Sequence, residues 1–265
     1  MSEKIPLNEY DRLRIRGIRD GELLPFIARD AERLARNLGA RIELARADAL
    51  VNGSVTIKEN GLVQQVIYGR RPGNGDKVAA VAWTDRANSR PIDDLLAWVE
   101  DYVNVNGVRP GRIVMSGARR ADLRMSAQVR AFAFGSTVNT PSMVTNDQAD
   151  AVLGGFDLPP IEVYDASVKV NGVVTRLLPT ANVLLLAAPQ APNGGGLPTG
   201  TDTGATFLGI TAESLEPEYG LEGDQPGIVA AQWRTRDPIR LWTHAAAVPL
   251  PVLTNPDLTY SVEVA

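Results

Sequence analysis

The feature that most constrains the fold is one long helical stripe near the start of the sequence. Its apolar members follow one another in steps of three or four, and they are Leu23, Ile27, Ala31, Leu34, Leu38, Ile42, Ala45 and Ala49. This spacing places all of them on one side of an α-helix. Asp20 can cap the start, and Asn52-Gly53 supplies a left-handed stop. A helix of about 30 residues would be about 45 Å long, which predicts a structural spine.

The sequence before this helix predicts an extended strand over residues 5–19. Leu13, Ile15 and Ile18 are interleaved with arginines in a largely two-residue period. The arginines are Arg12, Arg14, Arg16 and Arg19. A strand needs partners for its backbone groups, and the next segment is helical. We therefore expect the partner to be upstream sequence or another chain, and a frayed charged tail is the alternative.

The rest of the sequence predicts an inserted α/β module followed by returning strands. Asn60-Gly61 marks a hairpin between residues 55–57 and 63–68. After a loop at 69–91, the expected elements are a helix at 92–105, a strand at 112–116, helices at 118–132 and 147–153, and strands at 161–168, 173–174 and 182–188. Residues 189–205 predict a low-complexity loop. Closing strands are expected at 228–233, 238–244 and 258–264, with Pro249 and Pro251 implying an edge or a break between the last two.

Composition removes several classes of function. The 265 residues include no Cys and a single His, so disulfide frameworks, thiol nucleophiles and zinc–cysteine sites are excluded. Any Ser-His-Asp triad would need His244, which we interpret as a packed strand residue. The 31 acidic against 27 basic side chains argue against a nucleic-acid-binding surface. The charged first thirty residues are unlike a signal peptide, and the longest apolar run, residues 183–189, is too short to cross a bilayer, so we expect no membrane association.

Four further patterns are candidate sites, and each favours a structural explanation. Ser116 lacks the flanking glycines of a nucleophile elbow, and residues 73–77 lack the spacing of a phosphate loop. The acidic run Glu213, Glu216, Glu218, Glu222 and Asp224 misses the spacing of a calcium loop and predicts a solvated face. Basic residues of the helix at 118–132 have no aromatic companions for stacking on bases; they are Arg119, Arg120, Arg124 and Arg130. We therefore expect no catalytic residue, cofactor or metal ion, and the architecture favours a protein that binds copies of itself.

Several stretches resemble the lambda-type phage major capsid protein E family in the same order. They are Arg46 to Gly53, Asp93 to Trp98, Leu178 to Val183, Gln232 to Pro238, Ala247 to Leu250, Asn255 to Asp257 and Ser261 to Ala265. The likeness extends from about residue 20 to the end. It implies an α+β chain with the Hong Kong 97-like major capsid protein fold: a long spine helix, a peripheral β-sheet and an inserted α/β axial domain.

The resemblance also implies a domain plan. Residues 1–21 would be part of the extended loop that overlaps a neighbouring subunit, residues 22–90 and 226–265 the peripheral domain, and residues 91–225 the axial domain. Family members usually carry an N-terminal arm and the other half of the loop before the spine helix. The sequence would then begin inside that loop, so that the chain is processed, is part of a longer protein, or is completed by another protein.

The implied function is assembly without catalysis. The chain would form hexamers and pentamers of an icosahedral virion shell that encloses double-stranded DNA without specific binding, assembled in the host cytoplasm. Decoration, scaffolding and portal proteins are possible partners, and Arg12, Arg14, Arg16 and Arg19 are the expected inter-subunit contacts. The alternatives are an encapsulin-like or gene-transfer-agent shell, or a monomeric α/β hydrolase or binding protein.

Overall fold

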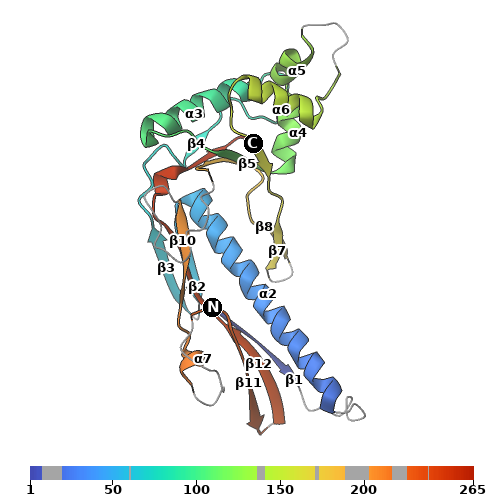
Figure 1. Cartoon of the computed structure of the whole chain (residues 1–265), viewed down its shortest axis with the longest axis vertical. Coiled ribbons are helices and arrows are strands. Elements are labelled where there is room, and N and C mark those ends of the chain that lie inside the picture. The colour runs from blue at the N-terminus through green and yellow to red at the C-terminus, as the bar shows by residue number, and fades with distance from the viewer. Residues whose placement is uncertain are drawn as a thin grey trace. The chain divides into compact units, whose positions relative to one another are not determined.

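The computed structural model describes residues 1–7, 20–59, 61–135, 141–170, 173–188, 203–216, 226–237 and 239–265, and it does not describe the side chains of residues 20–27, 59, 62, 170, 236 and 239. The chain divides into two compact units (Figure 1). Unit 1 comprises residues 1–45, 58–62 and 206–251, and unit 2 comprises residues 46–57, 63–205 and 252–265. Within the described part of the chain, no helix combines the length and apolar character needed to cross a membrane.

The predicted spine helix is confirmed. Helix α2 runs from Asp20 to Asn52, and Leu34 and Leu38 on its apolar stripe have no exposed surface. Gly53 ends it with a φ of 64°, and its N–H donates to the carbonyl of Ala49. The left-handed conformation that Asn52-Gly53 predicted is therefore present at the glycine, where it carries no steric cost.

Unit 1 is built on an antiparallel sheet with the strand order β1-β12-β11. The strands are β1 (Ser2–Leu7), β11 (Val229–Arg236) and β12 (Ile239–Ala246). Ile5 of β1 and Ala245 of β12 pack against Leu34 and Leu38, so the apolar stripe of α2 covers one face of this sheet. Unit 1 also contains the short helix α7 (Ala212–Leu215) and most of a ribbon formed by β10 (Gly204–Gly209) and β13 (Val248–Leu253).

Unit 2 is built on a mixed five-stranded sheet with the order β4-β14-β9-β5-β6. These strands are β4 (Lys77–Val78), β5 (Arg112–Met115), β6 (Ile161–Val163), β9 (Asn182–Leu186) and β14 (Thr259–Glu263). The pairs β5–β6 and β4–β14 are parallel, whereas β9 is antiparallel to both of its neighbours. The C-terminal strand β14 thus joins the sheet of the α/β module.

Four helices, one hairpin and most of a second hairpin complete unit 2. The helices are α3 (Pro91–Asn106), α4 (Gly117–Met125), α5 (Ala127–Phe134) and α6 (Asn146–Gly155). The hairpins pair β2 (Ser54–Glu59) with β3 (Leu62–Ile67), and β7 (Ser167–Val170) with β8 (Val173–Arg176); a short 3-10 turn, η2, spans Pro256–Leu258. The main core gathers α3, α5, β9 and β14 around Trp83 and Trp98, whose rings stack with centroids 5.9 Å apart.

The structure corrects two predicted elements. The helix expected at 118–132 is two helices, because Ser126 adopts an extended conformation between α4 and α5 (ψ 144°) and its side chain accepts a hydrogen bond from the Val129 N–H. A serine that caps a new helix ends the preceding one. The strand expected at 161–168 is interrupted and becomes β6 and β7.

Two further predictions, one wrong and one confirmed, concern the C-terminal third. Strand β10 begins at Gly204, inside the loop expected at 189–205, whose residues 189–202 lie outside the described part. Pro249 and Pro251 lie within strand β13, which pairs with β10 alone in a two-stranded ribbon. Of the two outcomes that the prolines implied, the structure shows the edge, because proline has no N–H to give to a second neighbour.

Candidate assembly surface

The N-terminal strand does not need a partner from outside the chain. Strand β1 pairs antiparallel with β12 along its whole length, from Ser2 opposite Ala246 to Leu7 opposite Leu241. The expectation that residues 5–7 would pair with upstream sequence or another chain is therefore wrong. The reason is topological, since the partner β12 comes from near the C-terminus and is not adjacent to β1 in the sequence.

Both ends of the arginine-rich segment are attached to ordered structure. Residues 8–19, which include the predicted contacts Arg12, Arg14, Arg16 and Arg19, lie outside the described residues. On the near side, Ile5 packs against the apolar stripe of α2, and the Asn37 side chain donates to the Glu3 carboxylate at 3.1 and 3.2 Å. On the far side, the chain enters α2 at Asp20. The segment thus connects a paired strand to the helix that packs on it.

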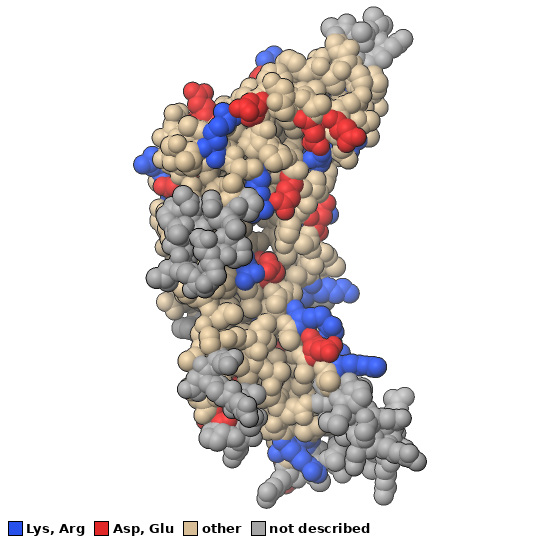
Figure 2. Space-filling view, viewed as in Figure 1, with Lys and Arg blue, Asp and Glu red and all other residues tan. Residues whose placement is uncertain are grey.

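The exposed side of α2 is charged and largely self-paired. Arg33 lies 3.4 Å from Asp30 and Arg36 lies 3.8 Å from Glu32, at the three- and four-residue spacings that bring side chains together on a helix. Figure 2 shows blue and red side chains together along this helix. Such exposed pairs contribute little stability, about 0.5 kcal/mol each. Their mixed signs also do not form the basic stripe that a nucleic-acid surface needs.

The side chain of the single histidine, His244 of β12, projects from the face of the unit 1 sheet that lies opposite α2. His244 lies edge-on to Trp233 with ring centroids 5.5 Å apart, and its Nδ1 is 3.6 Å from the Glu213 carboxylate of α7. Burial lowers the pKa of His244, the Glu213 charge opposes that shift, and the Lys4 charge adds to it. The interpretation of His244 as a packed strand residue is confirmed, with Trp233 and Trp242 stacked beside it at 6.0 Å.

The acidic run forms no described metal site. Glu213 contacts His244, Glu216 is exposed, and Glu218, Glu222 and Asp224 lie outside the described residues. Among the residues that the structure describes, no group of three or more His, Asp or Glu side chains is arranged to hold a metal ion.

Ser116 has a structural role in the helix that follows it. Its buried Oγ accepts the Arg119 N–H at 3.3 Å and donates to the Thr180 carbonyl at 3.2 Å. The hydroxyl therefore caps α4 and joins it to the chain before β9. Both of its hydrogen-bonding functions are used internally, which agrees with the missing nucleophile elbow.

Residues 73–76 form a turn, and Lys77 begins strand β4. The Asp76 carboxylate accepts the N–H groups of Gly73 and Gly75 at 3.1 and 3.3 Å, and Gly73 has a φ of 93°. These N–H groups are the donors that a phosphate would need, and a carboxylate from the same turn occupies them. The Lys77 side chain is also engaged internally, because it pairs with Asp101 and lies over the Tyr260 ring.

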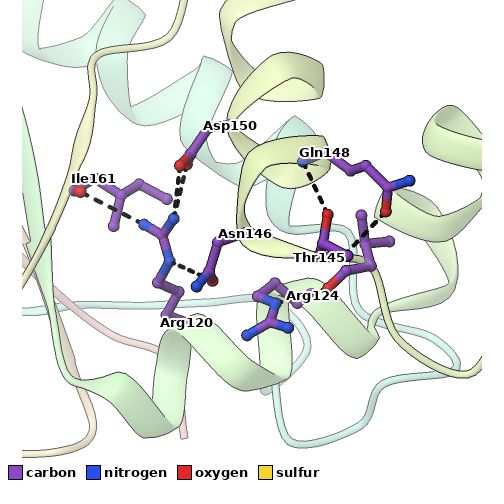
Figure 3. Close-up of polar contacts among 8 residues, drawn as sticks. Arg120, Arg124, Thr145, Asn146, Gln148, Asp150 and Ile161 are labelled. Atoms are coloured by element: carbon purple, nitrogen blue, oxygen red, sulfur yellow. Dashed lines mark hydrogen bonds and ion pairs between the residues drawn. The ribbon is translucent and has the colours of Figure 1, made fainter.

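Two arginines of the predicted basic face of residues 118–132, Arg120 and Arg124, are engaged by internal partners. Arg120 donates to both carboxylate oxygens of Asp150 at 2.8 and 2.9 Å, and also contacts Asn146 and the Ile161 carbonyl (Figure 3). Arg124 donates to the Val144 carbonyl at 2.7 Å, next to the capping box that Thr145 and Gln148 form at the start of α6. These arginines fasten α4 to α6, so the structural explanation is confirmed for Arg120 and Arg124.

A buried ion-pair cluster holds the remaining arginine of α4. The Asp122 carboxylate, 4% exposed, accepts two hydrogen bonds from Arg86 at 2.8 and 3.0 Å and lies 3.2 Å from Arg119. Arg119 is itself nearly buried, with 11% of its side chain exposed. Two cations share this one carboxylate, so its removal would leave the nearly buried Arg119 without an opposite charge.

Sequence reasoning missed one surface, the ribbon of β10 and β13. Its described stretches, residues 203–210 and 247–254, contain no charged side chain. Large apolar side chains nevertheless lie exposed on it, among them Phe207, Ile210 and Val248 at 47%, 48% and 52%. The absence of charge over two separate stretches was the available signal, but it identifies a surface only once the two strands are known to pair.

Comparison with known proteins points to one kind of molecule. The family model described as phage major capsid protein E matches residues 3–264. A search of curated proteins finds no match. Among solved structures, a prophage protein of E. coli CFT073 named as a capsid protein has a TM-score of 0.68 at 16% identity, over 100% of this chain and 76% of that one. A phage-related protein of Bordetella bronchiseptica RB50 has a TM-score of 0.61 at 14% identity, over 100% and 75%. The capsid of Myoviridae phage XM1 has a TM-score of 0.53 at 11% identity, over 100% and 72%.

Proposed function

Because the chain belongs to the phage major capsid protein E family, we propose that it acts through contacts between its own copies and not as an enzyme. The fold is Hong Kong 97-like, and the chain is a capsid component of a phage virion. The observation that carries the proposal is that this fold extends over the whole chain, while the candidate reactive groups Ser116 and His244 are each engaged by internal partners. These side chains thus serve packing within the subunit, and we propose that the surface of the subunit serves assembly.

The extended-loop assignment is part of this proposal. Residues 1–21 would belong to the loop, and Arg12, Arg14, Arg16 and Arg19 would make ion pairs with acidic side chains of a neighbouring subunit. Anchoring supports the assignment, because β1 is paired over residues 2–7 and α2 is packed on the same sheet. A segment held at both ends can reach a neighbour without detaching from its own subunit.

The domain plan is a further part of the proposal. Residues 22–90 and 226–265 would form the peripheral domain, and residues 91–225 the axial domain around the capsomer centre. Helices α3 to α6 and strands β5, β6 and β9 support an axial unit because they share one core. Strands β4 and β14, from the proposed peripheral segments, complete the same sheet.

The partners of the shell are also proposals. Hexamers and pentamers of this chain would enclose double-stranded DNA, with assembly in the host cytoplasm and with decoration, scaffolding and portal proteins as further partners. The acidic excess of the sequence, 31 against 27, suits an enclosure that does not adhere to DNA, since phosphate binding scales with basic contacts.

The test is assembly of the purified chain, followed by sedimentation velocity and negative-stain electron microscopy. We expect closed shells from the wild type. The double variant Arg14→Glu and Arg16→Glu should remain folded subunits, whereas Arg14→Lys with Arg16→Lys, which keeps the charge, should still assemble. Persistent monomers of the wild type under all conditions would overturn the shell function, and normal shells from the glutamate variant would overturn the role of the arginines.

A further inference from the structure

The ribbon of β10 and β13, most of which belongs to unit 1, exposes apolar side chains and carries no charge. Gly209 lies beside Val248, since a side chain added at Gly209 would meet the Val248 Cβ at 3.3 Å, and Gly204 lies beside Val252 at the other end. The two strands are therefore antiparallel. Side chains alternate between the faces of a strand, so Phe207 and Gly209 share the face of Val248.

The outward face of the ribbon is apolar. Ala247 packs against Leu34 and Leu38 of α2, and Pro249 and Pro251 are buried, so this alternate set on β13 faces inward. Val248 therefore faces outward, together with Phe207 of β10. The two side chains remain 52% and 47% exposed.

Strand β10 also exposes apolar side chains on its other face. Leu208 and Ile210 are 41% and 48% exposed, although they alternate with Phe207. Both sides of β10 thus present apolar surface, and residues 203–210 and 247–254 contain no charge to break it. Strands that face water normally carry charged residues, which prevent unintended association. We define the apolar ribbon as Phe207, Leu208, Ile210 and Val248 with the strands that carry them.

From these observations we propose that the apolar ribbon is a contact surface between two copies of this chain. Charge is the first argument for this occupant. A partner that covers the ribbon removes no charged group of the ribbon from water. The ribbon therefore fits a partner surface that is also free of charge. The same ribbon on a second copy of the chain is such a surface. A charged partner surface fits less well. The outer side of α2, with its Arg33–Asp30 and Arg36–Glu32 pairs, would lose the hydration of its charges if it covered the ribbon.

Area is the second argument. Stable protein–protein interfaces use about 20–30 residues from each partner, and the apolar ribbon offers only a few. It is too small to hold an isolated dimer. A contact of this size suits a closed shell, where symmetry repeats it and other contacts act at the same time. The inference therefore rests on the proposed shell function.

The first experiment compares charge substitutions at two exposed valines. Val248→Glu places a carboxylate on the outward face of the ribbon. Val173→Glu is the matched control, because Val173 is 67% exposed on the β7–β8 ribbon, which already carries Lys169 and Arg176. Circular dichroism and thermal unfolding check that both variants fold. Because an unpaired charge is costly to bury, we expect V248E to lower the yield of shells more than about tenfold while V173E assembles like the wild type.

The second experiment does not depend on the glutamate variant. The sequence has no cysteine, so Val248→Cys introduces a single thiol for maleimide labelling. We expect labelling in shells assembled from the pure variant to be more than about tenfold slower than in free subunits, since a thiol covered by a second copy is reached only when the contact opens. Equal labelling rates would overturn the inference and would point to a different protein as the partner of the ribbon.

The outcomes separate this inference from the function on which it rests. If the wild type and V248E both form shells in equal yield, the contact is overturned and the shell function stands. If the wild type forms no shells, the shell function is overturned and the inference with it. If V248E does not fold, the thiol measurement decides alone.

Discussion

The end of the spine helix depends on one guanidinium group and on the space beside it. Arg70 donates to the carbonyls of Val51 and Leu50 at 2.7 and 3.0 Å and to the Thr259 hydroxyl at 3.4 Å. A Cβ at Gly75 would lie 1.9 Å from Arg70 Nη2, so alanine at this position must displace the guanidinium. Gly75 is not among the glycines with positive φ, so the substitution adds no backbone strain. We therefore predict that Gly75→Ala destabilises the protein through Arg70.

The size of the effect follows from the contacts. Hydrogen bonds to a charged group contribute about 1.5–3 kcal/mol each, and two of the three bonds from Arg70 satisfy carbonyls at a helix end. Burial opposes this gain, since it lowers the pKa of Arg70 while the charges of Asp76 and Asp257 act against the shift. After that offset, we expect Gly75→Ala and Arg70→Ala each to lower the free energy of unfolding by about 2–3 kcal/mol. The melting temperature would fall by about 4–10 °C.

A double-mutant cycle measures whether Gly75→Ala and Arg70→Ala lower the stability through the same interaction. Urea unfolding followed by circular dichroism gives the free energy for the wild type, Gly75→Ala, Arg70→Ala and the double variant. If Gly75→Ala acts only by displacing Arg70, it should cost less than about 0.5 kcal/mol once the guanidinium is gone.

The control is a glycine at which an added Cβ would contact no other residue. Gly39 lies within α2 and a side chain added there has no neighbour within 4 Å, so Gly39→Ala should stabilise the helix by up to about 1 kcal/mol. Additive losses in the Gly75 and Arg70 cycle would refute the reasoning, because they would mean that alanine at position 75 disturbs something other than the guanidinium.

Three further predictions concern the other internal contacts. Asp122→Asn should lower the free energy of unfolding by about 3–5 kcal/mol in chemical denaturation, because it leaves the nearly buried Arg119 without its carboxylate; a loss under about 1 kcal/mol would contradict this account. Burial lowers the pKa of His244 below its ordinary 6.5, so the unfolded chain binds the proton more readily and stability should decrease as the pH falls below 6.5. We expect the melting temperature of His244→Gln to fall less steeply below pH 6.5 than that of the wild type. An unchanged dependence of the melting temperature on pH would show that other groups cause the decrease. Ser126→Ala removes the cap that accepts the Val129 N–H and should cost about 1 kcal/mol in thermal unfolding; a rise in stability would mean that the break between α4 and α5 is strained.

The parts of the fold that the sequence predicted are those governed by local periodicity. The stripe from Leu23 to Ala49 predicted α2, and Asn60-Gly61 predicted the β2–β3 hairpin. Helix α3 begins at Pro91, one residue before the predicted start at 92. Each depends on residues within a few turns of one another, where helix spacing or turn chemistry decides the outcome. The break at Ser126 was missed because an isolated serine is tolerated within a helix and becomes a cap only when its side chain turns to the next N–H.

The pairing of β1 and the apolar ribbon could not be predicted in the same way. A period of two identifies a strand but not its neighbour, and Lys4 lies opposite His244, 240 positions away in the sequence. The expectation of an external partner for this strand failed because it considered only adjacent sequence.

The same argument explains why an assembly surface is harder to find than an active site. Catalytic groups are recognisable by residue type, and here Ser116 and His244 could be judged one by one against the partners that hold them. Phe207 and Val248 are ordinary apolar residues, and each alone would be assigned to a core. Only the pairing of β10 with β13 shows that they share an uncharged face while remaining half exposed. For a protein that works through its surfaces, the informative property is therefore a mismatch between residue type and exposure, and that mismatch exists only in the folded chain.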